Sequence, residues 1–177
     1  MRVISGSARG RSLKAAVPKD VRPTSDRVKE AMFAMVFSRG GVHGWNVVDL
    51  FCGTGGLGIE ALSRGAEFVT FVDGSVRSIK AVEENLLAVG LPLSATARYR
   101  SSLPGWKPAQ PVDLVLADPP YDFNNWVALL EGFPAELAIC ESAKALPEIP
   151  GWETAKVNTY GTTLLTVLEK RLEVVSS

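Results

Sequence analysis

The sequence is poor in metal-binding side chains and in long apolar runs. Its 177 residues include two cysteines, Cys52 and Cys140, which lie far apart, and one histidine, His43. These residues match no metal-ligand spacing, so we expect no metal site and buried or incidental cysteines. No run approaches the ~20 apolar residues of a membrane span. The first residues also lack the apolar stretch of a secretory signal, so we expect a cytoplasmic protein that does not contact a membrane.

The protein also has no net charge, because its 19 basic residues balance its 19 acidic residues. The balance hides an asymmetry along the chain. Residues 1–40 contain nine basic residues and three acids, a net charge of +6, which leaves −6 for the other residues. A basic end on an acidic body is typical of a protein that binds a polyanion, although a solvated basic tail would give the same pattern.

The hydrophobic pattern predicts an α/β fold. A helix should begin near residues 24–25, after a proline. Short apolar stretches at 46–51, 68–73, 94–99, 112–117 and 135–142 read as strands, and the stretches 56–65, 75–90 and 124–133 read as helices. This alternation predicts a mostly parallel, doubly wound sheet. Residues 152–171 predict a final hairpin. We expect a small basic extension over residues 1–40 and a doubly wound domain over 41–177.

A glycine-rich loop follows the first strand of this domain. In "DLFCGTGGLG", Gly53, Gly55 and Gly58 form a G-x-G-x-x-G pattern that opens a helix, and Asp73 ends the next strand 20 residues later. This context predicts a bound cofactor whose ribose hydroxyls donate hydrogen bonds to the Asp73 carboxylate. The alternative is a tight turn without a ligand.

The loop alone leaves the identity of the cofactor open. A nicotinamide dinucleotide would place its pyrophosphate at the start of the helix. S-adenosylmethionine has no phosphate, and its amino-acid end carries an ammonium group. Asp49, four residues before Gly53, suits a cationic ligand end better than a pyrophosphate. Asp49 could instead form an ion pair or accept hydrogen bonds from amides of the loop.

The stretch "LVLADPPYDF" ends another strand on Asp118, Pro119, Pro120 and Tyr121. In a doubly wound sheet this strand neighbours the first at ~4.8 Å, so the four residues should face the glycine loop. The Asp118 carboxylate and the Pro119 carbonyl could accept both hydrogens of an exocyclic amine on a base that stacks on Tyr121. Held in this way, the nitrogen is oriented for methyl transfer without a metal. The alternative is a rigid turn with Tyr121 packed in the core.

Three motifs together resemble the bacterial small-subunit ribosomal RNA guanine-N2 methyltransferases of the RsmD type: "DLFCGTGGLGIEALSRGA", "DPPY" and "RPTSDRVKE". The resemblance covers nearly the whole chain, including "MRVISGSARGRSL" and "ESAKALP". It implies a class I S-adenosylmethionine-dependent fold with seven strands, the last one antiparallel. It also implies a monomeric enzyme that methylates the N2 amine of a specific guanine in 16S ribosomal RNA or in the small subunit.

Two alternatives remain open at this stage. Because "DPPY" is shared with adenine-N6 methyltransferases, the protein could methylate adenine in DNA or RNA. It could also be a nucleic-acid-binding protein that retains the fold without catalysis.

The resemblance further implies roles for individual residues. Catalytic roles fall to Asp118, Pro119, Pro120 and Tyr121. Cofactor binding falls to Asp49, Phe51, Gly53, Thr54, Gly55 and Asp73, with Ser101 or Ser102 as the candidate adenine contact. RNA binding falls to Arg2, Arg9, Arg11, Lys14, Arg22, Thr24, Asp26, Arg27 and Glu30. No metal is implied.

Overall fold

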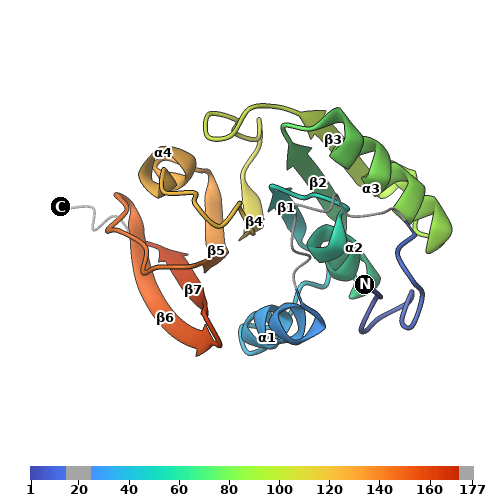
Figure 1. Ribbon diagram of the computed structural model, residues 1–177, viewed down its shortest axis with the longest axis horizontal. Helices are drawn as coiled ribbons and strands as arrows, with labels where there is room; N and C mark the ends of the chain where they lie inside the picture. The colour runs from blue at the N-terminus through green and yellow to red at the C-terminus, as the bar shows by residue number, and fades with distance from the viewer. Residues whose placement is uncertain (15–24, 172–177) are drawn as a thin grey trace.

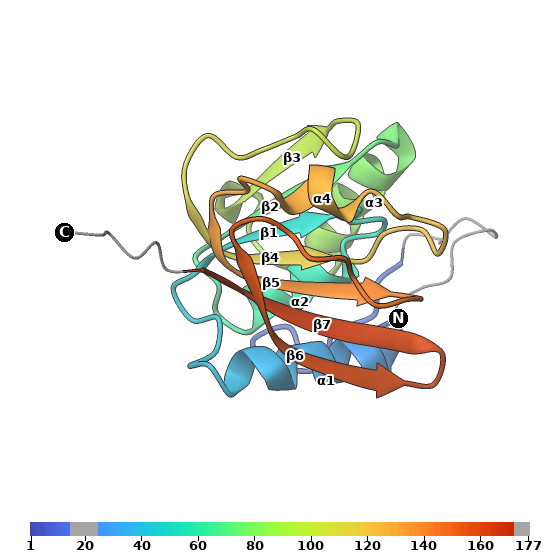
Figure 2. The same cartoon turned by 90° about the vertical axis from the view of Figure 1, so that its left-hand side faces the viewer.

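A computed structural model of the protein describes residues 1–14 and 25–171 and contains a seven-stranded sheet (Figure 1). The strands are β1 (Asn46–Leu50), β2 (Phe68–Asp73), β3 (Thr96–Arg100), β4 (Val112–Ala117), β5 (Ala135–Ser142), β6 (Trp152–Tyr160) and β7 (Thr163–Lys170). Their order is β3-β2-β1-β4-β5-β7-β6, and β7 runs in the direction opposite to the other six strands. Figure 2 shows the strands side by side. This topology confirms the predicted fold, including the antiparallel last strand.

The helices cover the two faces of the sheet unequally. They are α1 (Asp26–Phe37), α2 (Gly56–Ser63), α3 (Val76–Ala88) and α4 (Trp126–Leu130), with a 3₁₀ turn η1 (Leu93–Ala95). In Figure 1, α1, α2 and α3 lie on one side of the sheet and α4 lies on the other. Within residues 1–14 and 25–171, no helix is long and apolar enough to cross a membrane.

Each face of the sheet carries its own hydrophobic core. Along β4, Leu114 and Leu116 pack in the core beneath α1, α2 and α3, whereas Val115 and Ala117 pack in the core beneath α4. Strands buried on both faces need apolar residues at successive positions, which explains why these strands read as continuous apolar runs.

The local sequence accounts for most element ends. Ser25 caps α1, because its hydroxyl oxygen accepts a hydrogen bond from the N–H of Val28 at 3.2 Å. The helix expected over 124–133 is shorter than predicted. Asn125 provides no side-chain cap, and the backbone leaves helical geometry at Glu131 before Gly132 adopts a φ of 63°. Both cysteines are buried and free, as expected from the sequence.

The first residues of the chain are attached to α2 by a buried ion pair. Lys29 on α1 and Glu60 on α2 are almost fully buried, with the Lys29 Nζ 3.5 Å from a Glu60 oxygen. The Lys29 ammonium donates to the Arg2 carbonyl at 2.6 Å. The Glu60 carboxylate accepts from the N–H groups of Ile4 and Ser5 at 2.8 and 2.9 Å. Burial lowers the pKa of Lys29, and the nearby Glu60 opposes this shift.

The described part of residues 1–40 therefore packs on the same core as the sheet. Val3, Ala8 and the inner face of α1 belong to the core beneath α2 and α3. A division at residue 40 into a basic RNA-binding extension and a methyltransferase domain stays a prediction about function.

Replacing Lys29 by Met should destabilise the protein strongly. The substitution removes one of the two cations beside the buried Glu60 and leaves the Arg64 guanidinium at 2.8 Å. The loss should therefore lie near the lower end of the about 3–5 kcal/mol that is typical of a broken buried pair. Urea unfolding followed by circular dichroism would measure this change in the free energy of unfolding. The control is Arg39→Met, because Arg39 pairs with Glu169 at 2.8 Å where the Glu169 side chain is half exposed. An exposed pair is worth about 0–1 kcal/mol, so equal losses in the two variants would contradict the prediction.

Candidate active site

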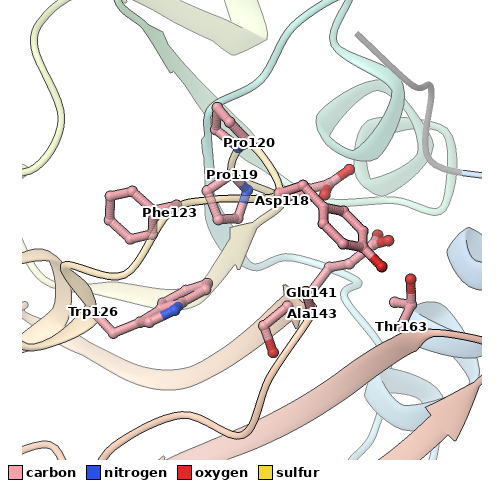
Figure 3. Close-up of a pocket in the computed structure, with 10 residues that line it drawn as sticks. Asp118, Pro119, Pro120, Phe123, Trp126, Glu141, Ala143 and Thr163 are labelled. Carbon is pink, nitrogen blue, oxygen red and sulfur yellow. The ribbon is translucent and has the colours of Figure 1, made fainter.

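A cleft lies at the carboxyl end of β4, beside the point between β1 and β4 where the strand order reverses. These two strands pair in parallel with Leu50 opposite Ala117, so the segments after them leave the sheet side by side. Such a point is where doubly wound sheets bind ligands. The described residues that line the cleft come from the ends of β4 and β5, from α4 and from the start of β7 (Figure 3): Asp118, Pro119, Pro120, Tyr121, Phe123, Trp126, Glu141, Ser142, Ala143 and Thr163.

The glycine loop takes a conformation that ordinary residues rarely adopt. Phe51, Gly53 and Gly55 have φ values of 56°, 52° and 84°, and Gly55 is the N-cap of α2. Gly58 is required by packing instead, because a Cβ atom there would lie 2.3 Å from the ring of Phe71. The loop is thus shaped for close approach of a ligand, as the pattern predicts.

Asp49 holds the glycine loop from beneath. It is 1% exposed, and its Oδ2 accepts a hydrogen bond from the N–H of Gly58 at 2.8 Å. Burial raises its pKa to about 8, and the charges of Asp118 and Asp73 contribute to the rise. Asp49 is therefore an acceptor for a loop amide, one of the alternatives considered from the sequence. A contact between Asp49 and a cationic ligand end stays a prediction.

Asp73 lies at the end of β2, next to the same loop. Its two oxygens accept from the N–H groups of Gly53 at 3.0 Å and Ser75 at 2.8 Å. Ser101, directly after β3, donates its N–H to the Asp73 carbonyl at 3.0 Å, while Ser102 is exposed. The fold thus places Asp73 and both candidate serines at adjacent strand ends.

Asn85 is a site residue that sequence reasoning missed. It is fully buried on α3, and its amide nitrogen donates to the carbonyl of Thr54 in the glycine loop at 2.9 Å. Its amide oxygen accepts from the N–H of Lys14 at 2.8 Å. The signal for it was a polar residue on the apolar stripe of this helix, beside Val82 and Leu86. Asn85 holds the cofactor loop and the N-terminal segment at a fixed distance.

Tyr121 is not packed in the core. Its side chain is 64% exposed, and its hydroxyl lies 3.2 Å from the Thr162 hydroxyl in the turn between β6 and β7. Behind it, the Phe123 ring packs edge-on against Phe51 at 5.0 Å and against Trp126 at 5.2 Å. The ring of Tyr121 is exposed, so the alternative in which it packs in the core is wrong. A contact between this ring and a flat ligand stays a prediction.

The basic residues of the N-terminal segment have different surroundings. Arg9 and Lys14 are exposed, Arg2 lies 3.8 Å from Asp26, and the Arg11 guanidinium donates to the Val89 carbonyl at the end of α3. A further group lies on the exposed side of α1: Asp26, Arg27 and Glu30. The predicted RNA contacts Arg22 and Thr24 lie outside the described residues.

Comparison with known proteins decides the family. A family model described as "Conserved hypothetical protein 95" matches residues 1–169. The "Ribosomal RNA small subunit methyltransferase D" of Haemophilus influenzae is 33% identical over 91% of this chain and 89% of its own length. The chain belongs to this family. A further family member, "Putative rRNA methyltransferase YlbH" of Bacillus subtilis, is 37% identical over 97% of this chain and its own whole length.

Solved structures agree with this family assignment. "Putative methyltransferase yhhF from Escherichia coli" superposes with a TM-score of 0.81, 28% identity and coverage of 96% of this chain and 97% of that chain. A Synechocystis magnesium protoporphyrin IX methyltransferase with bound S-adenosylmethionine shares the fold at a TM-score of 0.69 and 17% identity, over 93% and 88% of the two chains. The protein is thus an S-adenosylmethionine-dependent methyltransferase of class I, as its motifs predict.

The residues at the loop fit this cofactor better than they fit a dinucleotide. Asp49, Asp73 and Asp118 converge on the loop closely enough for the latter two to raise the pKa of the first. These acidic side chains disfavour a pyrophosphate, whereas an ammonium or a sulfonium would favour the ionised form of Asp49 and ribose hydroxyls could donate hydrogen bonds to Asp73. Space is also available, because a Cβ atom added at Gly53 would have no neighbour within 4 Å.

The raised pKa of Asp49 predicts a pH-dependent cost to stability. Since the folded state favours the protonated carboxyl, the stabilisation is present at low pH and is lost as pH rises from about 4 to about 8. Asp49→Asn keeps an acceptor for Gly58 and cannot ionise. We expect the stability of wild type relative to this variant to fall across that range, by about 1.4 kcal/mol per pKa unit. Parallel curves of unfolding free energy against pH would contradict this.

Proposed function

We propose that the protein transfers a methyl group from S-adenosylmethionine to the exocyclic N2 amine of a specific guanine in 16S ribosomal RNA of the small subunit. The observation that carries the proposal is the exposed ring of Tyr121 beside Asp118, in a cleft at the end of β4, the strand that pairs with β1 just before the glycine loop. Relatives named as ribosomal RNA small subunit methyltransferases support the RNA substrate. Such a protein would work as a monomer in the cytoplasm, where ribosomal RNA is present.

The chain's residues would hold and orient the target amine. The base stacks on Tyr121, and its two amine hydrogens bond to the Asp118 carboxylate and the Pro119 carbonyl. Pro120 has no N–H, and the rings of both prolines fix φ, so the carbonyl keeps its direction. These hydrogen bonds favour a pyramidal nitrogen and stabilise the positive charge that develops on it. This nitrogen would receive the methyl group of S-adenosylmethionine, which leaves as S-adenosylhomocysteine, and the Asp118 carboxylate would accept the proton that the amine loses.

The cofactor-binding residues follow from their positions around the loop. S-adenosylmethionine, when bound, supplies the methyl group as a sulfonium. Asp49 and the backbone of Phe51, Gly53, Thr54 and Gly55 would contact its amino-acid end. Asp73 would accept from the ribose hydroxyls, with Ser101 or Ser102 near the adenine.

The N-terminal extension would bind RNA. Arg9, Lys14 and Arg2 would contact phosphates, whereas Arg11 already donates to the Val89 carbonyl and would contribute less. The motif residues Arg22, Thr24, Asp26, Arg27 and Glu30 would close over the target nucleotide. The target guanine would have to leave its stack to reach Tyr121.

Methylation of RNA from cells that lack the enzyme tests this function. Purified protein and labelled S-adenosylmethionine would be incubated with naked 16S RNA and with small subunits, and the RNA would be digested. We expect N2-methylguanosine at one mapped position. N6-methyladenosine alone would support the alternative adenine methyltransferase, and no transfer would support a binding protein without catalysis.

Replacing Asp118 by Ala should remove most of the activity. The variant loses an acceptor aimed at the charge that develops on the amine, a loss of about 10²–10³-fold in rate. Single-turnover methylation would measure it, with calorimetry to show that S-adenosylhomocysteine still binds. A variant that retains wild-type rate would contradict the catalytic role of Asp118.

Replacing Arg9 by Ala should weaken RNA binding and reduce its dependence on salt. Each lost phosphate contact lowers the slope of log K against log salt by about 0.9 for duplex or about 0.7 for single-stranded RNA. The control is Lys170→Ala, because Lys170 is half exposed at the end of β7 and pairs with Glu136 at 3.7 Å. Filter binding at several salt concentrations would compare the variants. An unchanged slope for the Arg9 variant would refute the contact.

A further inference from the structure

Glu141 is a second carboxylate at the cleft. It lies near the end of β5, which pairs with β4 so that Cys140 is opposite Ala117. Asp118 follows Ala117 and Glu141 follows Cys140, so the two residues lie at the same level of neighbouring strands that are about 4.8 Å apart. Both residues line the cleft, and Figure 3 shows their carboxylates directed to the same side of it.

The backbone of Glu141 is fixed from both sides. Its strand also pairs with β7, where Glu141 is opposite Leu165. One carboxylate oxygen, Oε2, is shielded from solvent. A carboxylate on a backbone fixed in this way distinguishes hydrogen-bond donors from acceptors on a ligand better than a side chain on an open loop would.

The edges of guanine and adenine differ at the position beside the amine. Guanine has a proton on N1 next to its N2 amine, whereas adenine has a lone pair on N1 next to its N6 amine. If the amine hydrogens occupy the Asp118 carboxylate and the Pro119 carbonyl, the ring N1 is the next polar atom along the edge. An ionised carboxylate only accepts hydrogen bonds.

We propose that Glu141 accepts the N1–H of the target base and so selects guanine over adenine. The inference rests on the proposed function and names the residue that determines its base specificity. Guanine gives a charge-assisted hydrogen bond at this point. Adenine would bring its N1 lone pair against a carboxylate, leaving both acceptors without a proton. The Asp-Pro-Pro-Tyr segment cannot make this distinction, because it recognises only the amine.

A base analogue isolates this contact. 2-Aminopurine keeps the 2-amine, has a lone pair in place of the N1 proton and lacks the 6-oxygen. Because the 6-oxygen is missing for both enzyme variants, its effect cancels when their guanine preferences are compared. The mapped target guanosine in the RNA would be replaced by 2-aminopurine riboside, and single-turnover methylation would be compared for wild type and Glu141→Gln. A glutamine amide can accept from guanine or donate to 2-aminopurine. We therefore expect the guanine preference of wild type to fall by about 10- to 100-fold in the variant, the range for one such hydrogen bond.

The control is Glu136→Gln on the same strand, because the Glu136 side chain is 69% exposed and forms its ion pair with Lys170. Its guanine preference should equal that of wild type. Thermal unfolding and binding of S-adenosylhomocysteine would show that each variant is folded.

Two results would overturn the proposal. If Glu141→Gln slows methylation of both bases equally, Glu141 only supports the cleft and the base is selected elsewhere. Equal use of both bases by wild type would refute the selection whatever the variant does. Failure of the proposed function is a separate outcome, because wild type would then produce no N2-methylguanosine in unsubstituted RNA.

Discussion

The pairing of β1 with β4 is the constraint on which the site depends. Because Leu50 is opposite Ala117, the glycine loop and the Asp-Pro-Pro-Tyr segment begin one residue later at the same edge of the sheet. Both strands are buried on both faces, so these loops cannot separate without breaking central backbone hydrogen bonds. The edge-on contact of Phe51 with Phe123 adds a side-chain link between them. Methyl transfer needs two reactants in fixed orientation, which this rigid arrangement supplies.

The second property of the site is its concentration of acidic side chains. Asp49, Asp73 and Asp118 converge on one loop, and burial together with their mutual repulsion raises the pKa of Asp49 to about 8. A cationic ligand relieves this repulsion, whereas an anionic one adds to it. The glycine pattern says less about which cofactor binds than the acidic residues around it do, because dinucleotide-binding enzymes share that pattern.

Most of the strands and the Asp-Pro-Pro-Tyr part of the cleft were predictable because their signals are local, whereas the cleft residues from β5, α4 and β7 were not. Continuous apolar runs, glycines and the two prolines each act within a few residues of chain. Asn85 and the role of Lys29 were not predictable in this way. Lys29 counts as one of nine basic residues in the first 40, yet it is buried against Glu60, 31 positions away. Asn85 contacts Thr54 and Lys14 from a third element. Such contacts depend on packing between distant segments.

The close register of β4 and β5 determines where the chain tolerates a change in length. Side chains alternate between the two faces of a strand, so one residue inserted within β5 would turn Glu141 away from the side that Asp118 faces. The connections over 101–111 and 143–151 lie outside the strands, so their lengths can change without altering that alternation. Homologous chains that keep this site should therefore differ in the lengths of these connections and agree in the spacing within the two strands.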